Sequence, residues 1–250
     1  MTRDARATPA ATPPSRAAAA WAAVALTLRQ LGRADALRYF AGQALQRGSA
    51  GRARIVRYYL VAQPVKPVSV QRAAASTTVV RRLEPGDAAL ALLPRSPQLI
   101  AERFANGDLC LAVLVKDRLA AFLWLAFDAY EEDDVRCRYR LLDSDLAWDY
   151  DVHVEPDFRM GRSLARLWDA ANALLGARGV RWSLSRISAF NPGSLAAHER
   201  LGARRLFGVT FVCLGRLQIT FGARRYLPTI SLKPATRPVL ALRAPAERGR

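Results

Sequence analysis

The chain has 250 residues, of which 51% are hydrophobic, and a formal net charge of +17. This length allows one large domain, or a domain with an extension, and it is sufficient to bury a sizeable core. No run of about 18 strongly apolar residues occurs, so no membrane-spanning helix is expected. The cysteines Cys110, Cys137 and Cys213 are scattered and match no metal-ligand spacing, which predicts reduced thiols in a cytoplasmic compartment.

The positive charge is concentrated at the two ends of the chain. Residues 1–76 carry eleven Arg and one Lys against two Asp, a net +10, and residues 223–250 carry six Arg and one Lys against one Glu, a net +6. Only +1 is left for residues 77–222. Basic flanks predict an anionic partner, which would be a lipid surface, a nucleic acid or an acidic carrier protein. The alternative is a compositional bias, because the chain is rich in Arg and Ala but has only three Lys.

The first 50 residues divide into a leader and a helical region. Residues 1–16 have the Pro, Thr and Ala content of a disordered leader, and their Arg content also matches a mitochondrial transit peptide. Apolar residues then recur at helical spacing, first as Trp21, Val24, Leu28 and Leu31, and after Gly32 as Leu37, Phe40, Ala44 and Leu45. Such a helix can lie on a membrane surface or pack on the core. Asp35 and two glycines favour packing.

The next elements read as strands and a helix. Residues 55–61 are strand-like, and the proline-containing stretch 63–76 reads as a linker. Residues 77–83 predict the first strand of a core domain, followed by a helical region to about Phe104. Residues 109–115 and 119–127 are nearly continuous apolar runs on either side of Lys116-Asp117-Arg118, which predicts a hairpin in a sheet covered on both faces.

The stretch from Tyr150 to Ala203 predicts strand, turn, helix, strand and helix in that order. Tyr150, Val152 and Val154 alternate as in a strand, and Pro156 ends it. Apolar residues at spacings of three and four predict a helix from Ser163 that stops at Gly176 and Gly179. Residues 180–187 form a second strand, Asn191-Pro192 then supplies an N-cap and a first helical residue, and Gly202 ends that helix.

This ordered set resembles the GNAT superfamily of N-acyltransferases. The family fingerprint is Gln/Arg-x-x-Gly-x-Gly/Ala at a strand-to-helix turn, and later Asn-x-x-Ala-x-x-x-Tyr-x-x-Leu-Gly. Here the matching residues are Gly161, Ser163, Asn191, Ser194 and Leu201-Gly202, whereas Phe158 replaces the Gln/Arg and His198 replaces the Tyr. The resemblance implies an α/β fold with a mixed sheet over residues 77–222. Residues 1–76 would then be a basic helical extension and residues 223–250 a basic tail.

The turn at Gly161 is the expected site for an acyl donor. Free backbone N–H groups and the helix dipole make a helix N-terminus attractive to anions, and Gly161 permits close approach to the backbone. In the family that anion is the pyrophosphate of coenzyme A. The resemblance therefore implies donor contacts from Val154, Arg159, Met160, Gly161, Arg162, Ser163, Leu164, Asn191 and Ser194. An isolated turn of this kind would be only an ordinary strand-to-helix connection.

Acidic residues are concentrated before this turn. Eleven of the 21 Asp and Glu lie between Asp128 and Asp157. By strand parity Asp149, Asp151, His153 and Glu155 share one face, where carboxylates would raise the pKa of one another. We nominate Asp149 and Asp151 as bases for a protonated amine, directly or through water. The alternative is that this face is open to water.

His198 is the candidate for the second proton transfer. In the family the residue at this place is the general acid that protonates the departing thiolate, and an imidazole can do so. The alternative is a partly buried helix histidine that packs beside Leu201. Neither His198 nor His153 has Cys or His neighbours at ligand spacing, so no metal site is expected.

The sequence therefore predicts an N-acyltransferase that uses acetyl-CoA and releases coenzyme A, with direct transfer to a primary amine in a ternary complex. The acid-lined strand favours a cationic acceptor. The competing interpretation is a non-catalytic GNAT-like module that binds an anionic surface through its basic flanks. The expected location is cytoplasmic, with peripheral attachment to a membrane left open.

Overall fold

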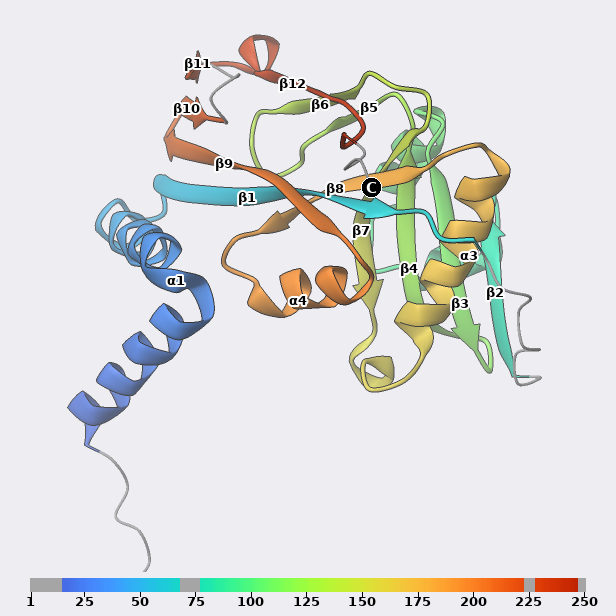
Figure 1. Cartoon of the computed structure of the whole chain (residues 1–250), viewed down its shortest axis with the longest axis horizontal. Coiled ribbons are helices and arrows are strands. Elements are labelled where there is room, and N and C mark those ends of the chain that lie inside the picture. The colour runs from blue at the N-terminus through green and yellow to red at the C-terminus, as the bar shows by residue number, and fades with distance from the viewer. Residues whose placement is uncertain (1–14, 68–76, 223–227, 247–250) are drawn as a thin grey trace, which may run out of the picture.

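In the computed structural model, the described residues are 15–67, 77–222 and 228–246. Within them one large mixed sheet organises the fold (Figure 1). Its strands, from edge to edge, are β11 (Thr229–Ser231), β10 (Leu217–Phe221), β9 (Arg204–Leu214), β1 (Ala53–Pro64), β8 (Trp182–Ser188), β7 (Leu146–Val154), β4 (Arg118–Ala126), β3 (Leu109–Val115) and β2 (Thr78–Leu83). Neighbouring strands are antiparallel except β7 and β8, which are parallel. The predicted α/β class with a mixed sheet is confirmed.

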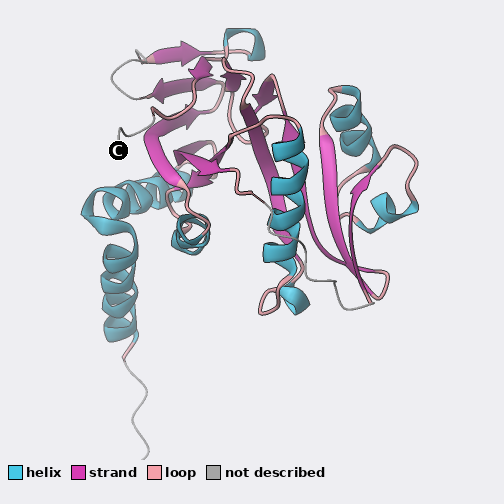
Figure 2. Ribbon diagram, turned by 45° about the vertical axis from the view of Figure 1, so that its right-hand side comes forward, coloured by secondary structure: helices cyan, strands magenta, loops and turns pink. Residues whose placement is uncertain are grey.

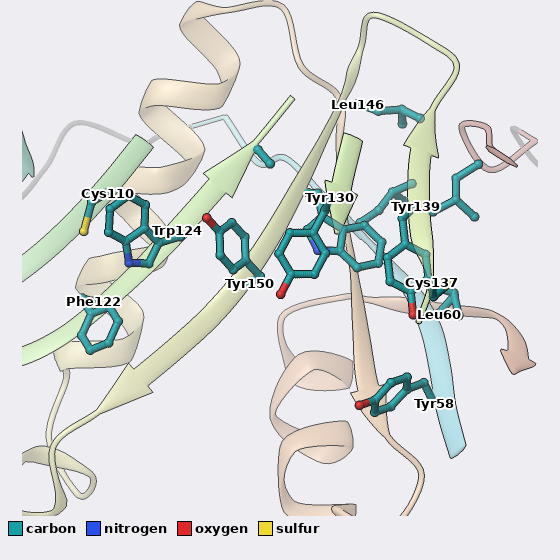
Figure 3. Packing of buried hydrophobic residues seen from close by; sticks show 14 of the residues in the cluster. Tyr58, Leu60, Cys110, Phe122, Trp124, Tyr130, Cys137, Tyr139, Leu146 and Tyr150 are labelled. Carbon is teal, nitrogen blue, oxygen red and sulfur yellow. The ribbon is translucent and has the colours of Figure 1, made fainter. Parts of the chain in front are cut away.

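A second, small sheet covers one face of the large one. Among the described residues it consists of β12 (Val239–Leu242), β6 (Arg138–Leu141) and β5 (Ala129–Glu131). The core between the two sheets is rich in aromatic rings, and Tyr139 stacks on Trp148 with ring centroids 4.4 Å apart. Figure 3 shows Trp124, Tyr150, Tyr130 and Tyr139 following one another across this face. We call it the small-sheet face.

Helices cover the opposite face, which we call the helical face. Helix α3 (Ser163–Ala177) lies across β2, β3, β4 and β7 and buries Leu167, Trp168, Ala171 and Leu175 against them (Figure 1). Helix α4 (Pro192–Arg200) packs Leu195 on Val61 and Ile187. Besides α1, which is described below, the other helical segments of the described residues are α2 (Pro97–Ala105) and the short η1 (Ala88–Leu92), η2 (Pro156–Phe158) and η3 (Pro234–Thr236). Among the described residues, no helix is both long and apolar enough to cross a bilayer.

Strand β1 lies inside the large sheet although it precedes residue 77. It is antiparallel to β8 through Tyr58–Pro64 and to β9 through Ala53–Ala62. A division of the chain at residues 76 and 77 would therefore remove an interior strand from the sheet. The predicted strand at 55–61 thus belongs to the core of the fold, and the predicted linker begins only after Pro64, with residues 68–76 outside the described part of the chain.

Helix α1 (Arg16–Gly48) has two parts with different surroundings. Gly32 has a left-handed backbone (φ 74°, ψ 163°) that interrupts the helix and kinks it. The second part packs on β1: buried Asp35 accepts hydrogen bonds from Arg57 Nε (2.9 Å) and from the Tyr59 hydroxyl. The first part projects away from the sheets, as Figure 2 shows. The expectation that this region packs on the core therefore describes only the residues after Gly32.

Candidate functional site

The candidate site opens where β7 and β8 separate. The two parallel strands are paired only from Leu146 to Trp148 on β7, and beyond Trp148 they diverge. A cleft of about 230 Å³ fills the gap. Its lining brings together five of the residues predicted from the sequence, namely Asp149, Asp151, Asn191, Ser194 and His198. Because the cleft lies between two strands of the sheet, side chains from both faces of the sheet reach it.

A bulge in β7 changes which side chains share a face. Trp124 pairs with Tyr150 and Phe122 pairs with His153, so Leu123 alone lies opposite two residues of β7. Asp151 occupies the extra place with φ of 50°. The predicted grouping of Asp149 with Asp151, His153 and Glu155 is therefore wrong. Strict alternation places them together, but the bulge leaves Asp149 on the helical face and turns Asp151 and His153 to the small-sheet face.

Asp149 is a buried carboxylate with polar neighbours. Its side chain accepts a hydrogen bond from the Ser183 hydroxyl, and the residue is 2% exposed. Burial raises the pKa of Asp149, and this effect outweighs the opposite influence of His198 and of hydrogen bonding to serine hydroxyls on β8. The direction agrees with a base, but its cause is burial and not the predicted repulsion between carboxylates.

His198 faces Asp149 from helix α4. Its ring lies edge-on to Trp168 of α3, with centroids 6.0 Å apart. Its Nδ1 atom is buried and has no hydrogen-bond partner among the described residues. The electrostatic interaction between Asp149 and His198 places the two groups in one local environment.

Asp151 is held by two arginines. Its carboxylate accepts hydrogen bonds from Arg95 Nε (2.7 Å) and Arg103 Nη1 (2.6 Å), and Arg95 adds a second hydrogen bond through Nη2. Burial acts to raise the pKa of Asp151, but the arginines outweigh it and the net pKa lies below the ordinary value. The expectation of a raised pKa is therefore wrong for Asp151, because its nearest charges are positive. In this setting Asp151 is a poor base.

The turn between β7 and α3 has the geometry expected of an anion site. Residues 159–162 connect η2 to Ser163, where α3 begins without a side-chain cap and without an acidic residue in its first turn. The first N–H groups of a helix have no acceptor within it. The predicted donor residues Arg159, Met160, Gly161 and Arg162 are exposed here, while Ser163 is buried and Leu164 half-buried. Arg159 Nε donates to the carbonyl oxygen of Val154 (3.2 Å), which ties the turn to the end of β7.

These donor candidates do not line the cleft itself. They lie at the N-terminus of α3, and Trp168, which touches His198, is five residues further along the same helix. Five residues correspond to roughly 8 Å along the axis. Helix α3 therefore connects the two halves of the candidate site along the helical face.

Asn191 and Ser194 form the N-terminal cap of helix α4. Asn191 is the N-cap of α4, and its Oδ1 accepts a hydrogen bond from the backbone N–H of Ser194 (3.0 Å). The predicted cap is therefore present. The same turn brings both residues to the cleft, next to His198 one helical turn later.

Sequence reasoning missed the arginine partners of Asp151 and the serine partner of Asp149. Arg95 and Arg103 lie about fifty residues earlier in the chain and carry no local signal. Ser183 alternates with buried Trp182 and Leu184, which indicates a polar residue on the helical face of β8 but not its partner. In the described part of the chain no group of three or more His, Cys, Asp or Glu is placed to hold a metal ion.

No protein-family model matches the sequence, and no curated protein matches it. Solved structures do resemble part of the chain. An acetyltransferase of the GNAT family from Novosphingobium aromaticivorans is 19% identical, with 63% of each chain covered and a TM-score of 0.42. A tandem GNAT protein from the clavulanic acid biosynthesis pathway is 16% identical, with 70% of this chain and 57% of that chain covered and a TM-score of 0.46.

A third similar structure is AAC(6')-Iy in complex with a bisubstrate analog, CoA-S-monomethyl-acetylneamine. It is 17% identical, with 51% of this chain and 90% of that chain covered and a TM-score of 0.37. The chain spans less than two thirds of the length of the first two structures. The first two structures carry the GNAT name, the family that the residues of the 150–203 stretch predicted. At these identities and TM-scores the chemistry of the site rests on its own geometry.

Proposed function

We propose that this protein is an N-acyltransferase that moves an acyl group, with acetyl as the expected one, from acyl-CoA to a primary amine by direct attack. The observation that carries the proposal is the gap between β7 and β8, which Asp149 and His198 line from the helical face and which is open to the small-sheet face. Such a gap lets a donor and an acceptor approach one carbon atom from opposite sides, as a ternary complex requires.

The donor half of the site fits coenzyme A. Acyl-CoA supplies the acyl group and the thiolate that leaves. The uncapped N-terminus of α3 offers N–H groups to a pyrophosphate, and Arg159 and Arg162 are exposed cations beside it. A side chain at Gly161 would bring a Cβ within 3.3 Å of the Phe158 carbonyl oxygen. Glycine therefore permits the tight turn and leaves its backbone accessible to a ligand. No acidic residue in the first turn of α3 opposes the anion.

The two proton transfers are assigned to residues on the helical face. We assign His198 to protonate the departing thiolate and Asp149, directly or through water, to take the proton of the amine. Asp151 is left out of the proton transfers, because two arginines bind its carboxylate.

The small-sheet face supports a cationic acceptor. A cavity of about 780 Å³ lies there, and it shares Tyr150 with the reaction cleft. Its wall includes Glu102, Asp128 and Asp133, which are exposed, whereas Glu132 is buried and paired with Arg186. Negative charge around the entrance would attract a protonated amine.

The test is an assay of thiol release from acetyl-CoA with the full-length protein and a panel of mono- and polyamines. Amine-dependent thiol release with formation of the matching amide is the expected result. Binding of coenzyme A without transfer to any amine would favour the non-catalytic module instead. Longer acyl-CoA donors in the same assay determine whether acetyl is the preferred group.

A further inference from the structure

The first part of helix α1, residues 16–31, has no covering element in the described structure. The kink at Gly32 separates it from the second part, which Asp35 fixes to Arg57 and Tyr59. Tyr39 of the second part also lies edge-on to Phe190, just before the N-cap of α4. The projecting part is therefore attached through a segment that packs on the fold, and it extends away from the sheets (Figure 1).

The projecting part exposes large apolar side chains. Trp21 is 73% exposed, Leu26 55% and Leu28 39%. All five tryptophans lie in the described part of the chain, and the other four are at most 9% exposed. Trp21, Val24, Leu28 and Leu31 follow one another at helical spacing and form one stripe. An isolated helix of about 15 residues is marginal in water, so this stripe requires an apolar cover.

The charges near the stripe select the kind of cover. No acidic residue occurs between Asp4 and Asp35, while Arg29 and Arg33 lie next to the kink and are exposed. A second copy of this chain would bring the same positive charges together. A nucleic acid would satisfy the arginines but would offer no apolar layer to Trp21 and Leu28. An anionic bilayer offers an apolar layer directly beneath negative headgroups.

We propose that residues 16–31 form an interfacial helix that inserts the Trp21 stripe into the surface of an anionic phospholipid bilayer. At a rise of 1.5 Å per residue the segment is roughly 24 Å long and lies along the surface. Arg29 and Arg33 contact the headgroups. Membrane attachment through this helix does not depend on the chemistry proposed for the cleft.

Trp21 makes the test direct, because it is the exposed tryptophan. Full-length protein is mixed with vesicles of equal parts phosphatidylcholine and phosphatidylglycerol, and with vesicles of phosphatidylcholine alone. We expect co-sedimentation with the anionic vesicles, a blue shift of the emission and protection from acrylamide. The Trp21→Phe variant should still bind but lose the spectral change. Raising the salt concentration should weaken binding, because screening shortens from about 10 Å at 0.1 M to about 3 Å at 1 M.

Two variants separate the charge from the apolar stripe. Arg29→Gln with Arg33→Gln should lower the partition coefficient about 25-fold, at about fivefold for each arginine near an anionic surface. Leu28→Asp should abolish insertion. The matched control is Ile230→Asp on β11, which also replaces an exposed apolar residue (66% exposed) and should leave binding unchanged.

Three results would overturn the proposal. The first is equal binding to neutral and anionic vesicles, and the second is equal loss of binding in the Ile230→Asp control. The third is protection of Trp21 without vesicles together with a dimer in sedimentation velocity, which would identify a second copy of the chain as the cover. Circular dichroism of each variant verifies that its helix content is retained.

Discussion

Asp149 and Asp151 are two residues apart on one strand, yet their surroundings give them opposite properties. Asp149 is buried on the helical face, where its hydrogen-bond donor is the neutral hydroxyl of Ser183 and burial raises its pKa. Asp151 is bound by Arg95 and Arg103, which outweigh burial and lower its pKa. The environment, and not the residue type, therefore decides which carboxylate binds a proton more tightly than an ordinary aspartate.

Asp149→Asn is expected to stabilise the fold at neutral pH. The pKa of Asp149 is raised in the native state, so the native protein binds this proton more tightly than the unfolded chain, and stability is lost as pH rises through the native value. Asn cannot ionise and avoids this loss. The melting temperature of the variant should exceed that of the wild type at neutral pH. This difference should disappear as the pH falls toward 3.8, the ordinary pKa of an aspartate.

Thermal unfolding across a pH series measures this effect. The control is Asp169→Asn, an exposed carboxylate on α3. If both variants changed the melting temperature equally at every pH, the buried state of Asp149 would have no energetic consequence.

His198→Ala is expected to lower kcat by roughly 10- to 1000-fold with little effect on donor affinity, because a general acid acts only in the transition state. His198→Tyr should retain activity and extend it to higher pH, since a phenol remains protonated there. Steady-state kinetics at saturating substrates, with chemistry rate-limiting, measure both. An unchanged kcat in the Ala variant would make His198 a residue that only packs on Trp168.

At the scale of elements, local signals predicted most of the strands and helices around the site. Asn191 and Pro192 are a cap and a first helical residue, and both functions depend only on neighbours in the chain. The bulge at Asp151 was missed, because nothing in the alternation of β7 marks an extra residue. It is held by Arg95 and Arg103, whose contacts form only after the chain has folded. Strand β7 was therefore predicted correctly, but the face on which its side chains lie was not.

Asp151→Asn is expected to destabilise the fold by about 3 kcal/mol, since it removes the charged partner 2.6 Å from buried Arg103 and leaves, among the described residues, only Asp133 at 3.9 Å. The pKa of Asp151 is lowered, so its contribution is present above the ordinary value of 3.8 and is lost as pH falls through the native value. Urea unfolding at neutral pH measures the cost. The control Asp157→Asn breaks an exposed pair with Arg118 and should cost less than about 1 kcal/mol. Equal costs would contradict a stabilising contribution from the contacts of Asp151 with Arg95 and Arg103.

Gly161→Glu is expected to abolish binding of coenzyme A while the protein stays folded. The new side chain would place a negative charge where the N–H groups of α3 would meet the pyrophosphate. Gly176→Glu is a matched control, because it makes the same substitution at the other end of α3, where its Cβ meets only Val65 at 4.0 Å. Calorimetric titration with coenzyme A compares them. Unchanged affinity in Gly161→Glu would remove this turn from the donor site.

At the scale of the whole molecule, strands from both basic flanks belong to the two sheets. Strand β1 joins β8 to β9, and β11 and β12 of the C-terminal region extend the large and the small sheet. Composition could not predict this, because it describes the flanks only as basic and separates them from the core at residue 77. Pairing between strands more than a hundred residues apart leaves no trace in local patterns. Strands β1, β11 and β12 of the basic flanks therefore belong to the scaffold, whereas the part of α1 before Gly32 projects from it.

Two deletions should consequently behave differently. A variant without residues 1–76 lacks β1, so β8 and β9 lose the partner that pairs with them through Tyr58–Pro64 and Ala53–Ala62, and their exposed edges should lead to aggregation. A variant without residues 1–31 keeps β1 and the Asp35 contacts, and its melting temperature should change by less than about 3 °C. Near-ultraviolet circular dichroism and thermal unfolding compare the two with the full chain. A soluble, cooperatively folded chain that begins at residue 77 would contradict the interior place of β1.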